Sequence, residues 1–149
     1  MRIQTLTAAA LALFVGTTLA FAATKDDAVA MVKKTVAAIK AGGAEKTYAA
    51  INTPGSAYQN GEVYVVVLGA DGTTLAHPVN PKLIGKNMME VQDVDGKFFT
   101  KDMVTRSKTE ASFWYDFKFV NPATKKIQVK DMYCEALAPT TICAGVYRP

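Results

Sequence analysis

The first regular pattern after residue 23 is an apolar stripe at helical spacing. The stripe consists of Val29, Val32, Val36 and Ile39, which recur three and four residues apart. Thr24 is a typical N-cap residue, and Asp26 and Asp27 occupy the first turn, where the helix dipole favours anions. The pattern therefore predicts an amphipathic helix that ends at the glycines 42–43, followed by a shorter helix over residues 44–51.

Residues 64–76 predict a β-hairpin. Residues 64–68 are apolar, aromatic or β-branched, and the glycine-containing segment 69–72 that follows is a turn signature. A second short run stops at His77, because the next residue is a proline, which lacks a backbone donor and favours an extended residue before it. The single histidine of the chain is thus expected at a strand end beside a long loop, where binding groups are commonly located.

The rest of the chain predicts one more helix and three more strands. The loop 79–94 is longer than a simple connection, and such loops in compact domains tend to be functional or disordered. The expected elements after it are a helix over residues 98–107 and strands over residues 113–120, 127–137 and 141–147. Because helices come first and strands later, we predict an α+β fold with N-terminal helices packed on an antiparallel sheet of about five strands.

The strand over residues 113–120 is strongly aromatic. Alternation assigns Phe113, Tyr115, Phe117 and Phe119 to one face, and Trp114, Asp116 and Lys118 to the other. Four aromatic residues on one face form either a plain core or the lining of a pocket. The strand pattern alone leaves both readings open.

The N-terminus predicts export. Arg2 precedes an apolar run over residues 8–21, and residues 20–22 satisfy the small-x-small cleavage rule, so residues 1–22 are expected to be a signal peptide. The alternative is a membrane anchor, but a run of about 14 residues is shorter than the roughly 20 that span a bilayer. The expected mature protein, residues 23–149, is a single domain with a periplasmic or secreted location.

Two cysteines in an exported chain suggest a disulfide bond. If the last two strands pair around a turn near residues 138–139, Cys134 and Cys143 lie directly opposite each other, close enough to be bridged. The alternative is a pair of buried free thiols. Nothing in the chain resembles a redox-active CxxC motif.

Several familiar kinds of site do not fit the sequence. The formal net charge of +4 is small and its lysines are scattered, so nucleic-acid binding is not indicated. Lys86 lacks the glycine and hydroxyl spacing of a phosphate-binding loop, and Asp93 and Asp95 make only half of a calcium loop. A nucleophile–histidine–acid triad would have to use His77, and neither it nor the two cysteines form a convincing zinc ligand set. We therefore expect neither a metal nor another cofactor.

The residues that remain suit a small anion. Lys130 lies in an otherwise apolar and small polar strand, and Tyr133 follows three residues later. If a bulge or strand end lets both reach one pocket, an ammonium and a phenol could bind a carboxylate between apolar walls. The alternative is that Lys130 is an exposed edge residue and Tyr133 an ordinary core residue.

The order of several short motifs resembles the single Cache domain family, in particular its small exported members. The motifs are Tyr64-Val65-Val66-Val67, Asp71-Gly72-Thr73, Ala76-His77-Pro78, Gly85-Lys86-Asn87, Asp93 with Asp95-Gly96-Lys97, the aromatic strand ending at Asn121-Pro122, Lys130, Tyr133 and Gly145-Val146-Tyr147. The resemblance covers nearly the whole of residues 23–149. It implies a PAS-like fold with helices on one face of the sheet and a small-molecule pocket on the other.

The resemblance also implies a site and a role. Family members are extracytoplasmic sensors for small metabolites such as organic acids, mostly within chemoreceptors and sensor kinases. By position, the implied ligand-binding residues are His77, Lys86, Asn87, Asp93, Trp114, Phe117, Lys130 and Tyr133. Phe117 stands where tyrosine is expected and Phe119 where tryptophan is expected, so the ligand is expected to be smaller or less polar.

The leading hypothesis is a non-enzymatic sensor domain that binds a carboxylate through Lys130 and Tyr133, with His77 as a polar, pH-sensitive wall. Since the sequence ends at Pro149 without a membrane helix or signalling domain, the expected partner is a membrane sensor kinase, a chemoreceptor or a second copy of the chain. The alternatives are an envelope interaction module whose pocket is filled by its own side chains and, last, a hydrolase that uses His77.

Overall fold

The computed structural model describes residues 22–149. The predicted signal peptide, residues 1–22, lies outside this range except for its last residue. Within the range, no helix combines the length and the hydropathy that crossing a membrane requires.

The two N-terminal helices confirm the pattern that predicted them. Helix α1 spans Lys25–Gly42 and helix α2 spans Ala44–Ile51. Thr24 and Asp27 form a capping box at the start of α1: Thr24 Oγ1 accepts from Asp27 N at 3.3 Å, and Asp27 Oδ2 accepts from Thr24 N at 2.8 Å. The buried face of α1 is centred on Ala28, Val32 and Thr35, whereas the other members of the predicted stripe are only partly buried.

The strands form one antiparallel sheet. Its members are β1 (Gln59–Asn60), β2 (Val63–Leu68), β3 (Thr74–Ala76), β4 (Ser112–Val120), β5 (Ile127–Leu137) and β6 (Thr140–Tyr147). The order is β1-β2-β6-β5-β4, and β3 pairs with β2 to complete the predicted hairpin. A short 3₁₀ helix η1 (Pro81–Leu83) and helix α3 (Phe99–Arg106) lie between β3 and β4. The α+β prediction is therefore confirmed, with one very short strand more than expected.

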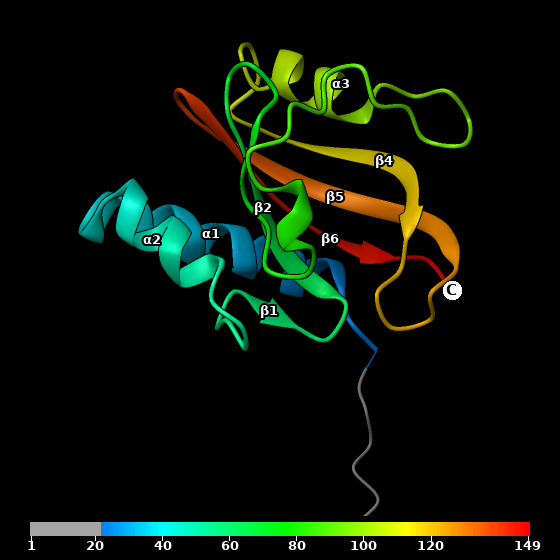
Figure 1. Ribbon diagram of the computed structural model, residues 1–149, viewed down its shortest axis with the longest axis horizontal. Coiled ribbons are helices and arrows are strands. Elements are labelled where there is room, and N and C mark those ends of the chain that lie inside the picture. The colour runs from blue at the N-terminus through cyan, green and yellow to red at the C-terminus, as the bar shows by residue number, and fades with distance from the viewer. Residues whose placement is uncertain (1–21) are drawn as a thin grey trace, which may run out of the picture.

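The helices cover opposite faces of the sheet (Figure 1). Helices α1 and α2 pack on one face, where the strands contribute an aliphatic core. Helix α3 and the segment before it cover the other face, where aromatic and sulfur-containing residues gather. We call these the α1 face and the α3 face.

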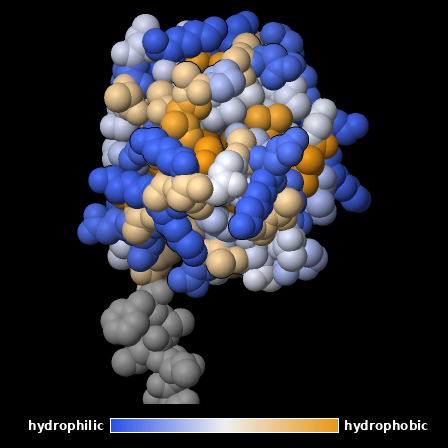
Figure 2. Space-filling model, turned by 90° about the vertical axis from the view of Figure 1, so that its left-hand side faces the viewer, coloured by the Kyte–Doolittle hydropathy of each residue, from blue (hydrophilic) through white to orange (hydrophobic). Residues whose placement is uncertain are grey.

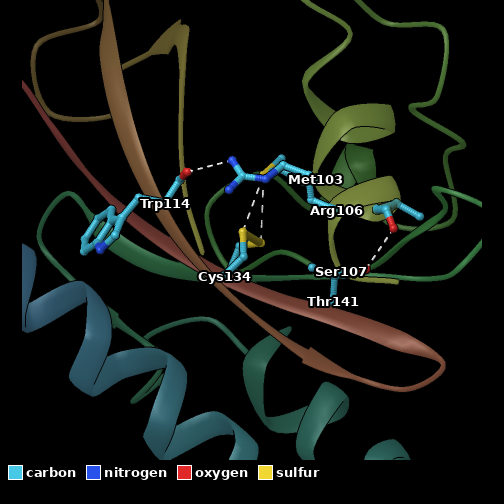
Figure 3. The surroundings of a disulfide bond; sticks show 8 residues. Met103, Arg106, Ser107, Trp114, Cys134 and Thr141 are labelled. Carbon is cyan, nitrogen blue, oxygen red and sulfur yellow. Dashed lines mark hydrogen bonds between the residues drawn. A yellow bond between two sulfur atoms is a disulfide. The ribbon is translucent and has the colours of Figure 1, made fainter. Parts of the chain in front are cut away.

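The predicted disulfide is present. Cys134 of β5 and Cys143 of β6 are directly opposite each other in the strand register and are bonded at an S–S distance of 2.05 Å. Both cysteines are fully buried on the α3 face, and because they are bonded to each other the structure contains the disulfide and not the pair of free thiols. Figure 3 shows the bond below Met103 of α3, whose Sδ lies 3.6 Å from Cys134 Sγ and 3.9 Å from Cys143 Sγ.

The surface is polar around the junction where α1 ends and α2 begins. On the face in Figure 2, hydrophilic side chains predominate and hydrophobic ones show in small areas between them. The large hydrophobic side chains that are exposed gather mostly around one shallow groove near the end of the sheet, namely Val91, Val94, Val120 and Ile127. The α1–α2 end therefore offers no broad apolar surface in this view.

Candidate functional site

A small cavity lies on the α3 face, between the sheet and the segments that cover it. Its volume is about 40 Å³, enough for about three water molecules at roughly 10–15 Å³ each. Its polar lining residues are Tyr64, Thr74, His77, Thr100 and Lys130, and its apolar ones are Val66, Leu68, Leu83, Met88, Phe99, Met103, Phe117, Phe119 and Met132. The cavity thus combines one polar region with a larger apolar wall.

A larger cleft, of about 720 Å³, lies beside the two ends of the described chain. Its lining includes Ala22, Arg148 and Pro149. Because it borders the point where the described residues begin, we assign no ligand site to it. The cavity under α3 is the candidate site.

Lys130 is the one cationic residue in the lining of this cavity. It comes from β5 and is only 1% exposed. Its Nζ lies over the ring of Tyr64, 3.6 Å from the ring centroid, and 4.9 Å from that of Tyr147. Burial lowers the pKa of the Lys130 ammonium, and the neighbouring Tyr64 opposes that change. None of the ion pairs among residues 22–149 involves Lys130.

His77 follows β3 and is 5% exposed. Its Nδ1 accepts a hydrogen bond from the backbone N–H of Asn80 at 3.0 Å, so the neutral ring carries its proton on Nε2. Burial, and next the charge of Lys130, lowers the pKa of His77 to about 4. The ring is therefore a neutral hydrogen-bond donor near pH 7, and neither ring nitrogen bonds a carboxylate among the described residues, as a triad histidine would.

Two buried tyrosines lie beside Lys130, and of these two, Tyr64 lines the cavity whereas Tyr147 lies behind the lining. The Tyr147 hydroxyl donates to the Val120 carbonyl at 2.9 Å. Since that uses its only proton, the hydroxyl of Tyr64, 3.2 Å away, donates to Tyr147. Burial raises the pKa of Tyr147, and Tyr64 adds to the effect, so the Tyr147 phenol stays a neutral donor.

The apolar wall is built from aromatic rings and methionines. Phe99 of α3 stacks on Phe117 of β4 with ring centroids 4.5 Å apart, and Phe119 meets Phe99 edge-on at 5.9 Å. Met103 and Met132 close the wall toward the disulfide. The parity prediction for β4 is confirmed, and its aromatic face serves both as core and as pocket lining.

The structure brings together three of the sequence-predicted site residues, His77, Phe117 and Lys130. It does not bring Tyr133 to them: β5 pairs regularly with both neighbours from residue 130 to 133, so residues three apart point to opposite faces. The Tyr133 hydroxyl instead donates to Glu135 Oε1 at 2.9 Å on the α1 face.

Trp114 also lies on the α1 face. Its ring centroid is 5.3 Å from that of Tyr133, and Lys25 Nζ lies over the Trp114 ring, 5.0 Å from its centroid. Trp114 is 37% exposed and does not line the cavity. The sheet itself therefore separates Trp114 and Tyr133 from Lys130.

Of the other predicted site residues, Asn87 and Asp93 hold the long loop in place. Asn87 Nδ2 donates to the Asp71 carbonyl at 2.8 Å, and Lys86 is exposed. The carboxylate of Asp93 accepts from the backbone N–H groups of Asp95, Lys97 and Lys118, each at 2.9 Å. None of these three predicted residues lines the cavity. Residues 22–149 contain no cluster of three or more His, Cys, Asp or Glu residues able to hold a metal ion.

Neither Tyr64, which lines the cavity, nor Tyr147, whose ring centroid is 4.9 Å from Lys130 Nζ, was among the predicted residues, although a signal for Tyr147 was available. The strand pairing that aligns Cys134 with Cys143 also aligns Lys130 with Tyr147. Residues aligned in this way share a face of the sheet. The register that predicts the disulfide therefore also predicts that Lys130 has Tyr147, and not Tyr133, as its neighbour on the same face.

Comparison with known proteins gives the family. A family model described as Single Cache domain 2 matches residues 18–147. The fold is similar to that of a methyl-accepting chemotaxis protein from Vibrio parahaemolyticus, with a TM-score of 0.70, 19% identity and coverage of 83% of this chain and 87% of that chain.

Two further solved structures are similar at comparable levels. One is a periplasmic sensor domain of a chemotaxis protein (TM-score 0.66, 19% identity, 83% of this chain and 90% of that chain). The other is a Cache chemosensory domain that recognises a carboxylic acid (TM-score 0.65, 18% identity, 83% and 88%). No curated protein sequence matches the chain. The structural likeness establishes the fold, and because the family match spans most of the sequence, the chain belongs to the Single Cache domain 2 family.

Proposed function

We propose that this protein is a non-enzymatic, extracytoplasmic sensor domain that binds a short monocarboxylate in the cavity under α3. The single observation that supports this most strongly is the buried ammonium of Lys130, which lines a cavity and takes part in no ion pair among the described residues. A buried charge is costly unless it is paired. A ligand carboxylate would supply the missing partner.

The lining favours one carboxylate and disfavours other charges. It contains no aspartate or glutamate, so an amino group on the ligand would find no counter-ion, and it contains a single lysine, so a second carboxylate would be unpaired. The Nε2–H of His77 is a neutral donor that suits the second carboxylate oxygen. The volume of about 40 Å³ leaves room for only a short carbon chain against the phenylalanine and methionine wall.

The sensory role follows from the family. Cache domains are sensory ligand-binding domains, and the similar solved structures include chemotaxis proteins and one domain that recognises a carboxylic acid. For this chain we propose the same use: periplasmic or secreted capture of a metabolite, reported through a chemoreceptor, a membrane sensor kinase or a second copy of the chain. No step of this role requires catalysis.

The test is calorimetric titration of the purified protein with acetate, propionate, hexanoate, succinate and glycine. We expect saturable binding of acetate and propionate, and much weaker binding of the longer, doubly charged or zwitterionic compounds. Lys130→Met should weaken propionate binding by about 100-fold or more, because the partner charge is lost. It should leave the melting temperature unchanged or higher, because an apolar residue of similar volume replaces a buried charge.

Lys126→Met is the matched control, since Lys126 is exposed and remote from the cavity lining. It should bind propionate as the wild type does. Equal affinity of wild type and Lys130→Met would remove Lys130 from the site. Failure of every carboxylate to bind would contradict the proposal and favour a protein-interaction module whose pocket is filled by its own side chains.

A further inference from the structure

Lys130 forms no ion pair with an acidic residue among residues 22–149, and burial lowers the pKa of its ammonium, so its charge depends on the other groups around it. The closest acidic candidate is Glu62 beside β2, which instead accepts from Asn121 Nδ2 at 3.0 Å. The other titratable groups facing Lys130 are Tyr64 from β2, His77 after β3 and Tyr147 from β6. The lining residues from α3 and β4 carry no titratable group, being Phe99, Thr100, Met103, Phe117 and Phe119.

The charge of Glu62 favours the ammonium from outside the cavity lining, whereas the two tyrosine rings contact the ammonium directly. Lys130 Nζ lies 3.6 Å from the centroid of the Tyr64 ring and 4.9 Å from that of Tyr147. Both distances are within the range for attraction of a cation to the negative face of an aromatic ring, and that attraction is strongest in a desolvated site. The carbon chain of the Lys130 side chain also passes close to the backbone of β6.

Gly145 leaves the space that the carbon chain of Lys130 occupies. It lies on β6 between Cys143 and Tyr147, on the face that carries the cavity. A Cβ at this position would come within 3.0 Å of Lys130 Cε and 2.6 Å of Met132 Sδ. The absence of a side chain at Gly145 therefore provides the channel in which the lysine stem reaches the tyrosine rings.

We propose that Tyr64 and Tyr147 form an aromatic cage that keeps Lys130 protonated and fixed in position while the cavity holds no ligand. The hydroxyl chain from Tyr64 to Tyr147 to the Val120 carbonyl fixes the two rings relative to the sheet. These tyrosines are positioning residues: they act on the ligand through Lys130. The cage sets the highest pH at which the site still presents a cation.

The consequence for binding rests on the proposed function. A carboxylate that enters finds an ammonium already in place, with no internal salt bridge to break. Without the cage, the desolvated lysine would lose its proton at a lower pH, and carboxylate affinity would decline at that lower pH as well. The cage therefore determines the pH range of the sensor.

The cage is tested without any ligand by measuring the pKa of Lys130 through its ¹³Cε NMR signal, assigned by its loss in Lys130→Met. In Tyr64→Leu we expect a Lys130 pKa about one unit lower than in the wild type, because the closest ring is lost. Tyr64→Phe is the matched control, since it keeps the ring and removes only the hydroxyl, and its Lys130 pKa should stay close to the wild-type value.

Tyr147→Leu is the second variant, for use also if Tyr64→Leu does not fold. It should lower the Lys130 pKa by less, since the Tyr147 ring is farther from Nζ. A Lys130 pKa that is unchanged or higher in both leucine variants would overturn the cage.

The second readout is the affinity for propionate as a function of pH. In the leucine variants the decline of affinity at high pH should move to lower pH together with the Lys130 pKa. If the wild type binds propionate but the decline of affinity in the leucine variants stays at the wild-type pH, the cage is overturned and the proposed function is not. Absence of propionate binding in the wild type would overturn the proposed function, and the NMR titration would still decide whether the cage exists.

Discussion

The two faces of the sheet are made from the same strands and differ in almost every other respect. In β2, Val63, Val65 and Val67 point to the α1 face, while Tyr64 and Leu68 point to the α3 face. The α1 face is a continuous aliphatic core under a long helix. The α3 face holds a disulfide, a buried lysine and a cavity.

One face of the sheet can supply most of the packing while the other face keeps a small cavity. Close packing on the α1 face supplies stability through buried apolar area. On the α3 face, α3 is attached by particular contacts: Arg106 Nη1 donates to the Trp114 carbonyl at 3.0 Å, and Thr141 Oγ1 donates to Ser107 Oγ at 2.7 Å (Figure 3). These contacts hold the helix over the cavity without filling it.

The largest expected effect on stability comes from the α1 face. Ile142 of β6 is fully buried in the aliphatic core. Ile142→Ala should lower the free energy of unfolding by about 3 kcal/mol, because it removes buried methylenes and leaves a cavity. Propionate affinity of the folded variant should not change. Urea unfolding and calorimetry measure the two quantities.

Ile127→Ala is the control for that substitution, since Ile127 is 54% exposed and should contribute little. A marked loss of propionate affinity in folded Ile142→Ala would contradict the separation of the two faces.

The next largest effect is expected at Gly145 of β6, where a substitution should lower both the free energy of unfolding and the affinity for propionate. In Gly145→Ala the new Cβ would lie 2.6 Å from Met132 Sδ and from the Asp131 carbonyl oxygen. We expect a loss of about 1–3 kcal/mol in unfolding free energy from overpacking, and a loss of propionate affinity because the Lys130 stem is displaced.

The matched control is Gly42→Ala at the end of α1, where the nearest atom to a new Cβ is Lys46 Cδ at 3.9 Å. It should be neutral or slightly stabilising, with unchanged binding. Unaltered propionate affinity in Gly145→Ala would show that the lysine does not need the space above Gly145.

The last expected effect is the pH dependence from His77 on the α3 face, which is absent near pH 7 and develops only in acid. Its pKa in the folded protein is about 4, below the ordinary value of about 6.5 for the unfolded chain. Between these values the unfolded chain binds a proton that the folded protein does not. Stability from this group is therefore fully present above about pH 6.5 and is lost as pH falls toward 4, with a slope of at most about 1.4 kcal/mol per pH unit.

Urea unfolding between pH 4 and 7 measures this slope, and His77→Gln should reduce it. An identical slope in wild type and His77→Gln would mean that His77 is not buried in its neutral form.

The sequence was sufficient for the elements that local physics determines. The capping pattern at Thr24, the hairpin turn before β3 and the cysteine pairing between β5 and β6 all follow from spacing and residue type, and the structure confirms them. The structure also confirms the predicted alternation of aromatic residues in β4, because the alternation of side chains along a strand does not depend on distant residues.

The site was only partly predictable because it depends on which strand faces meet. His77, Phe117 and Lys130 converge, but pairing Lys130 with Tyr133 required a bulge that β5 does not have. The methionines of the wall come from a loop, from α3 and from β5, and no local pattern links them. Asp93 carries a conspicuous turn motif, and its carboxylate is used to anchor that turn to β4.

The most direct test of the account is the response of the methionine methyl NMR signals to propionate. Met88, Met103 and Met132 line the cavity, whereas Met31 of α1 and Met89 do not. The account predicts saturable shifts of the first three signals and little change in the other two, and no such shifts in Lys130→Met. Shifts confined to Met31 or Met89, or no shift at any propionate concentration, would contradict the claim that the cavity on the α3 face is the ligand site.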